Sequence, residues 1–159
     1  MKNILVPSKG ILLSNSASEG TVYLYADLIA RGVRSIHRVV VADVRLLMEH
    51  HEKLRGSHVV LEGNNTAVAY ALLREKVPCT LVENDQDLLQ CRKLSDTGKM
   101  RRFVHEEKDF QTLVVTALDH ARRRMETANL VEYARFSIDR RGIEIDRFPQ
   151  FLRSQIILK

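Results

Sequence analysis

The residues best suited to binding chemistry follow two short apolar runs. Gly63-Asn64-Asn65-Thr66 comes directly after the run His58 to Glu62, and Glu83-Asn-Asp85 comes after the run Cys79 to Val82. Backbone amides in a turn that opens a helix can hold a phosphate, and a carboxylate about 20 residues later can accept hydrogen bonds from ribose hydroxyls. This pattern predicts a site for a nucleotide or another small anion, with these ligand-binding residues: Gly63, Asn64, Asn65, Thr66, Glu83 and Asp85.

Residues 58–90 resemble the dinucleotide-binding β-α-β unit, especially that of the potassium-transport regulator and pyridine-nucleotide reductase families. The resemblance rests on the apolar strand, the turn glycine, the small helix residues Ala67 and Ala71, the second strand and its terminal acid. It implies a Rossmann-like fold and a nucleotide ligand. Leu61 and Thr66 occupy the first and third positions of the glycine motif, where a Cβ crowds the turn.

Two resemblances give the acidic residues another role. Glu62-Gly63 with Asp85-Gln-Asp87 resembles the carboxylate pattern of topoisomerase-primase domains, and the acids from Glu83 to Asp87 resemble the strand-end motif of flap-type 5′ nucleases. Both imply Mg²⁺ bound by three or more carboxylates for phosphoryl chemistry. The alternative function is therefore a Mg²⁺-dependent enzyme that acts on nucleic acid, with Glu62, Asp85 and Asp87 as metal ligands and Glu83 nearby.

The positive charge is concentrated in the second half of the chain. The net charge is +5, and residues 1–90 carry 10 basic and 10 acidic residues, whereas residues 91–159 carry 15 and 10. Basic clusters lie at Lys99 to Arg102 and at Arg122 to Arg124. A basic surface attracts polyanions, so nucleic acid is a candidate partner for the region 92–124.

The elements that must position these residues alternate between strands and helices. Apolar and β-branched runs predict strands at 2–6, 38–42, 58–62 and 79–83. Between them, helices are predicted from the capping box Ser16 to Glu19 up to Gly32, from Asp43 to Gly56, and from Thr66 to Lys76. Such alternation is typical of parallel strands joined by right-handed crossovers, so the loops after four strands are expected to converge at one sheet edge.

The second half has a different pattern. Apolar residues recur at helical spacing between Lys108 and Thr127, which predicts a long amphipathic helix. The segments 130–138 and 143–145 flank Asp139-Arg-Arg-Gly142, which predicts an antiparallel hairpin. The expected fold class is α/β: a Rossmann-like, three-layer domain over residues 1–159, with a mainly parallel sheet and a C-terminal antiparallel hairpin.

Function remains open between three classes on these grounds. The first is a small ligand-binding or regulatory domain, and the second is the Mg²⁺-dependent enzyme. The third is a subunit that binds a partner or forms a homo-oligomer, supported by the missing glycines and by the apolar segment 148–158. Two dispersed cysteines and the lack of an apolar run of membrane-spanning length lead us to expect a cytoplasmic protein without membrane contact.

Overall fold

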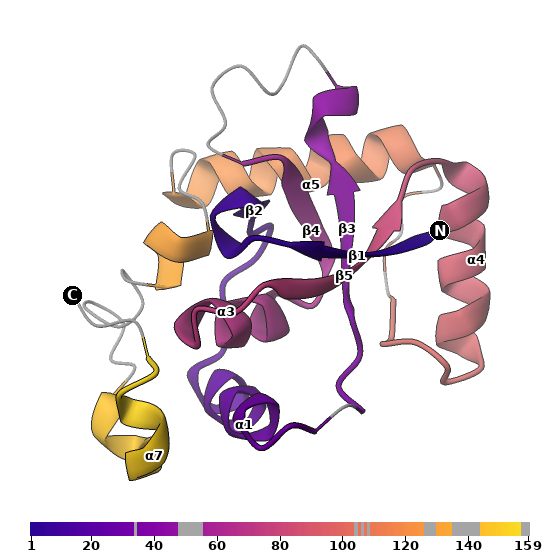
Figure 1. Cartoon of the computed structure of the whole chain (residues 1–159). Coiled ribbons are helices and arrows are strands. Elements are labelled where there is room, and N and C mark those ends of the chain that lie inside the picture. Colours follow the sequence, from indigo (N-terminus) through magenta and orange to yellow (C-terminus); the bar gives the residue numbers. More distant parts are fainter. Residues whose placement is uncertain are drawn as a thin grey trace.

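The computed structural model of the chain describes residues 1–33, 35–47, 56–103, 105, 107, 109–125, 130–134 and 144–156. Its centre is a five-stranded sheet in the order β1-β5-β3-β4-β2. The strands are β1 (Lys2–Val6), β2 (Ile11–Leu12), β3 (Val39–Asp43), β4 (His58–Glu62) and β5 (Val77–Val82) (Figure 1).

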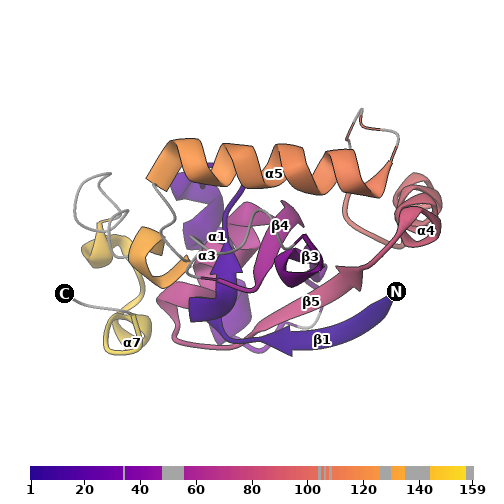
Figure 2. The same cartoon turned by 90° about the horizontal axis from the view of Figure 1, so that it is seen from above.

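Helices cover both faces of this sheet. On one face α1 (Glu19–Ala30) and α3 (Asn64–Leu72) pack against each other and the strands, and on the other lies α5 (Phe110–Met125) (Figure 1). Viewed from above, α5 extends across the molecule from the side of α4 (Asp85–Asp96) (Figure 2). The short helix α7 (Gln150–Arg153) belongs to the last described segment. Within the described ranges, no helix has the length and apolar character needed to cross a bilayer.

Alternation along the strands divides the core into two halves. Val39 and Val41 of β3 face α1 and α3, whereas Val40 and Ala42 face α4 and α5. All four side chains are fully buried. Strands covered on both faces lack the polar residues that would mark a solvent side, which explains why their sequences are continuous apolar runs.

The predicted strand positions are confirmed to within two residues, but the prediction of a mainly parallel sheet is wrong. The pairs β3–β5 and β2–β4 are parallel, whereas β1–β5 and β3–β4 are antiparallel. The sheet is therefore mixed. Double-sided burial produces the same apolar runs in either arrangement, so composition could not distinguish them.

The connection between β4 and β5 explains the difference. Strand β3 lies between them. It is antiparallel to β4 and parallel to β5, so β4 and β5 run in opposite directions. Because β5 begins at the sheet edge where β4 ends, the nine residues of α3 join two strand ends on one edge. A right-handed parallel crossover would instead return the chain along the whole length of the sheet.

The helices show smaller differences from expectation. Helix α1 begins after Ser18 without a side-chain cap, so the prediction of a capping box that starts at Ser16 is wrong. The predicted end of the helix at Gly32 is confirmed, and this glycine has a φ of +75°. The structure also contains α4, which the sequence did not predict. Residues 44–46 form a 3-10 turn, and the rest of the helix predicted up to Gly56 lies mostly outside the described residues.

The prediction of a C-terminal antiparallel hairpin is wrong for those of its residues that the structure describes. Residues 130–134 are helical, and Ile145–Arg147 form a 3-10 turn; residues 135–143 lie outside the described part. The final apolar segment is folded onto its own chain, with Phe148, Leu152 and Ile156 buried in the core beside α1 and α3. Up to Ile156, this burial removes one of the two observations behind the oligomer hypothesis, the exposed terminal strand; the missing glycines are the other.

Candidate functional site

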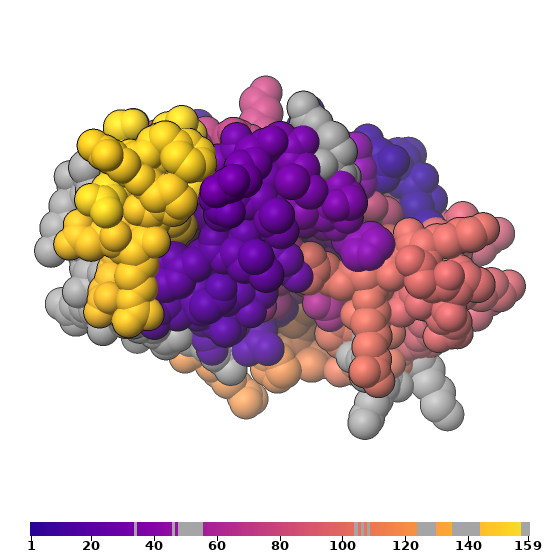
Figure 3. Space-filling view, turned by 90° about the horizontal axis from the view of Figure 1, so that it is seen from below, coloured from indigo at the N-terminus to yellow at the C-terminus, as the bar shows by residue number. Residues whose placement is uncertain are grey.

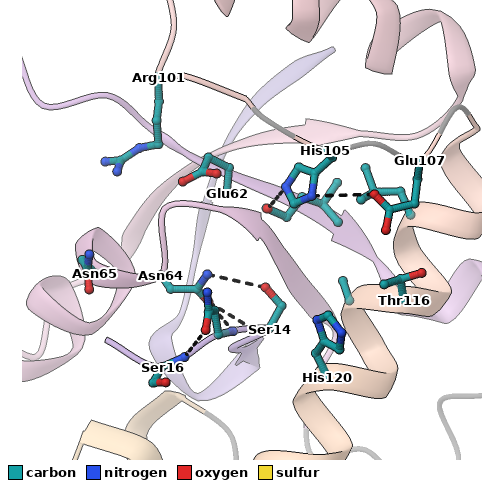
Figure 4. Close-up of a pocket in the computed structure, with 14 residues that line it drawn as sticks. Ser14, Ser16, Glu62, Asn64, Asn65, Arg101, His105, Glu107, Thr116 and His120 are labelled. Carbon is teal, nitrogen blue, oxygen red and sulfur yellow. Dashed lines mark hydrogen bonds and ion pairs between the residues drawn. The ribbon is translucent and has the colours of Figure 1, made fainter. Parts of the chain in front are cut away.

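A polar pocket of about 310 Å³ opens where β4 ends and α3 begins. Four parts of the chain far apart in sequence line it: the loop 14–16, the β4–α3 junction, the residues Arg101, His105 and Glu107, and the face of α5 that carries Thr116 and His120. Figure 4 shows these side chains around the opening. The predicted residues Asn64 and Asn65 lie in its wall, so part of the expected ligand site does border a cavity.

Asn64 holds the loop that forms one wall of the pocket. Its Oδ1 accepts hydrogen bonds from the backbone amides of Ser14 at 3.1 Å and Asn15 at 3.2 Å, and its Nδ2 donates to Ser14 Oγ at 3.5 Å. Ser14 is buried, whereas Asn15 is exposed. An asparagine at the first position of α3 therefore fixes a loop that lies 50 residues earlier in the chain.

The whole loop from 14 to 18 is held in the same way. Asn65 Oδ1 accepts from the amide of Ser18 at 2.6 Å. Side-chain oxygens also accept the two amides between: Asn15 Oδ1 binds that of Ser16, and Tyr133 Oη binds that of Ala17, each at 2.9 Å. Because all five amides have protein acceptors, this loop does not present a free row of donors to a ligand.

Arg101 lies at the end of the pocket beside α3. Its guanidinium donates to Thr66 Oγ1 and lies 5.6 Å from the centroid of the Tyr25 ring. Its Nε is buried and is the one such side-chain nitrogen or oxygen without a partner in the described part of the chain. A buried charged donor without an acceptor is costly, so an acceptor supplied by a ligand would stabilise this arrangement.

Gly63 provides the room that Arg101 occupies. Its φ is +101°, and a Cβ there would stand 3.3 Å from Val39 Cα and 3.5 Å from Arg101 Nε. The predicted turn glycine is therefore required by packing against β3 and against the guanidinium.

His105 and Glu107 form the opposite end of the pocket. His105 Nε2 lies 2.6 Å from the carbonyl oxygen of Leu61, and its Nδ1 lies 4.0 Å from Glu107 Oε2. A carbonyl only accepts, so Nε2 carries the proton and Nδ1 is left as the acceptor of the neutral ring. The ring is further held edge-on by Phe103, with centroids 4.7 Å apart.

Glu62 stands between these two ends (Figure 4). Its Oε1 accepts from the amide of Gly63 at 3.0 Å. The pocket thus combines cationic and helix N-terminal groups at the α3 end with carboxylates and histidines at the α5 end. Such a polarity suits a ligand with one anionic group and several hydroxyl groups.

Glu83 does not join this pocket. Glu62 pairs with Val40 on β3, whereas Val82, which precedes Glu83, pairs with Ala42. Gly63 and Glu83 therefore leave the sheet at opposite ends, roughly 13 Å apart along the strand direction at 3.3 Å per residue. The expected pose, with the pyrophosphate at Gly63 and the ribose at Glu83, is not formed; Glu83 instead pairs with Lys2 Nζ at 2.9 Å.

The carboxylates of the metal alternative are also separated. Asp85 Oδ1 accepts from the amide of Phe110 at 2.6 Å, which ties α4 to the start of α5. Glu62 is at the other end of the sheet. Among the described residues, no three His, Cys, Asp or Glu side chains are grouped to hold a metal ion. The structure does not bring together the proposed Mg²⁺ ligands Glu62, Asp85 and Asp87.

Asp87 has a structural role instead. Its Oδ1 lies 2.7 Å from the ammonium nitrogen of Met1, and its Oδ2 accepts from the amide of Glu83 at 3.0 Å. Burial alone would raise the pKa of Asp87, but the hydrogen bonds from the ammonium and the amide outweigh it and hold this pKa below its usual value.

Sequence reasoning missed the residues that complete the pocket. The sequence predicts Arg101 only as part of a basic cluster, and no motif marks Ser14. His105, Glu107 and His120 follow no spacing pattern, because they come from an irregular segment and from a helix that meet only in the fold. No family model, curated protein or solved structure matches this chain, so the proposals that follow rest on its own geometry.

Proposed function

We propose that this chain is a binding domain for a small phosphorylated ligand of the nucleotide or sugar-phosphate class, held in the pocket between α3 and α5. The observation that carries the proposal is the unpartnered, buried Arg101 Nε at one end of a polar pocket. A phosphate oxygen at that end would accept from Nε once the Arg101 side chain shifts to expose it, and would lie near the positive end of α3.

The opposite end supports the hydroxyl-bearing part of the ligand. Glu62 and Glu107 are acceptors for hydroxyl protons, and His105 Nδ1 is a further acceptor when the ring is neutral. The volume of about 310 Å³ is at the lower end of the range for ligand pockets, so a mononucleotide or a smaller compound fits the proposal better than a dinucleotide.

Isothermal titration calorimetry with AMP, ribose 5-phosphate and inorganic phosphate tests this proposal. We expect Arg101→Gln to weaken the binding of a phosphorylated ligand by about 10- to 150-fold, the loss of one charge-assisted hydrogen bond. Thr116→Tyr would fill the pocket from α5 and abolish binding, whereas Gln111→Tyr, at an exposed position of the same helix, would leave it unchanged.

Two results would overturn the proposal. One is the absence of heat or thermal stabilisation with all three compounds at millimolar concentration. The other is binding that Thr116→Tyr leaves intact, since the ligand would then occupy another part of the molecule.

A further inference from the structure

A second concave surface has no residue of α5 in its lining. Two adjoining hollows of about 700 and 490 Å³ share the residues Ser35, Ile36, His37 and Met100. Together they form one groove, which we call the 35–38/99–102 groove after the two segments that form its walls. In Figure 3 it lies where the violet surface meets the salmon surface.

The walls of this groove carry basic side chains that form no ion pair with the described residues. Arg38, Lys99 and Arg102 line it and are exposed. Within the described part of the chain, none of these three side chains has an ion pair or a hydrogen bond. Asp96 is the acidic residue among the described groove residues, so the groove has a net positive charge. Three free cations along a single path attract a polyanion.

The interior of the groove is suited to flat apolar groups. Tyr25, Leu28 and Met100 are partly exposed within it, and His37, which lines both hollows, is exposed. Aromatic and apolar side chains between cations are the arrangement on which unpaired bases stack while their phosphates contact the rim. A lipid bilayer would touch only the rim, because its surface is flat, and an acidic peptide would leave the aromatic surface unused.

We propose that the 35–38/99–102 groove binds single-stranded nucleic acid without sequence specificity. The cations contact phosphates, and His37, Tyr25 and Met100 contact bases. The site is independent of the phosphorylated-ligand pocket except at Arg101, which borders both, so the test leaves Arg101 unchanged.

Fluorescence anisotropy with a labelled oligothymidylate of about 12 nucleotides gives the direct test. Three phosphate contacts predict a slope of about −2 for log K against log salt, which is a loss of about 20-fold between 50 and 200 mM salt. Replacing Arg38, Lys99 and Arg102 together by Gln should weaken binding by at least that factor and make the slope nearly flat. The matched control replaces Lys9, Lys93 and Arg123, three exposed cations outside the groove, and should retain tight binding.

Three further probes separate nucleic acid from other polyanions. We expect an abasic strand of the same length to bind at least ten times more weakly, because it cannot stack. Oligoglutamate and vesicles containing about 30% phosphatidylserine should bind weakly or not at all. Equal affinity for the abasic strand or for oligoglutamate, preferential binding to vesicles, or no binding of oligothymidylate at 50 mM salt would each overturn the proposal. Equal losses in the groove variant and the control variant would overturn it as well.

Discussion

Replacing Asn64 by alanine should destabilise the protein by about 1.5–4 kcal/mol. The change removes the acceptor of two backbone amides, those of Ser14 and Asn15. The Ser14 amide belongs to a buried residue, so leaving it unsatisfied costs about 1–3 kcal/mol. The Asn15 amide belongs to an exposed residue and can bind water, so its loss costs about 0.5–1 kcal/mol.

Two companion variants make the reasoning specific. Asn64→Asp keeps both acceptor bonds and adds a negative charge at the start of α3, so it should retain stability within about 0.5 kcal/mol. Asn65→Ala removes one bond to the exposed Ser18 and should cost about 1 kcal/mol or less.

Urea denaturation followed by circular dichroism measures these differences. With a slope of about 2 kcal/mol/M, Asn64→Ala should lower the midpoint by about 0.75–2 M. If Asn64→Asp loses as much stability as Asn64→Ala, or if Asn64→Ala changes the midpoint by less than about 0.2 M, the acceptor bonds do not stabilise the loop and the account is refuted.

Three other predictions concern the core and the sheet edge. The pKa of Asp87 is held below its ordinary value, so its carboxylate stabilises the fold above the unfolded-state pKa of about 3.9. This contribution disappears as the pH falls through the folded-state pKa. Urea midpoints should therefore fall more steeply below pH 5 in the native chain than in Asp87→Asn. Burial raises the pKa of Cys79 to about 12 and that of Cys91 to about 11, so both thiols should react with a disulfide reagent at pH 8 only as the chain unfolds, and fast labelling in native buffer would contradict their burial. Gly63→Ala should lower the free energy of unfolding by about 2–4 kcal/mol, because it combines a positive φ with a close contact. Gly32→Ala, at φ +75° with open space around it, should lower it by about 1 kcal/mol. Equal losses in the two variants would show that the close contact at Gly63 does not affect stability.

The positions of four of the five strands could be predicted from sequence, whereas β2 (Ile11–Leu12) and the strand directions could not. Runs such as Val39 to Ala42 and Val59 to Leu61 identify buried strands because they are apolar at every position. The direction of β4 depends on the short path of α3 across one sheet edge, and nothing in the composition of residues 64–72 records that path. The unpredicted helix α4 buries the acid Asp87 with Leu88 and Cys91 and leaves Leu89 exposed, so its apolar residues do not mark a single buried face.

The candidate site was predictable only where it follows a strand. Gly63 and Asn64 could be singled out because a glycine and a small amide after an apolar run mark a turn that opens a helix. Their tasks differ from the expected ones: Gly63 makes room for Val39 and Arg101, and Asn64 holds the loop at Ser14. The resemblance to a dinucleotide-binding unit depended on local order along the chain, and it could not show that β3 separates β4 from β5.

The strand order also determines when the sheet can be completed during synthesis. Strand β1 is translated first, yet its partner is β5: Ile4 pairs with Cys79, which is 75 residues further along the chain. At about 5–20 residues per second, a ribosome needs roughly 4 to 15 s to reach that partner. During this interval the backbone of β1 has no strand to pair with, and the same is true of the β5 side of β3. A nascent chain that stalls before Val82 therefore exposes two unpaired strand edges, and its survival depends on chaperones or on rapid release.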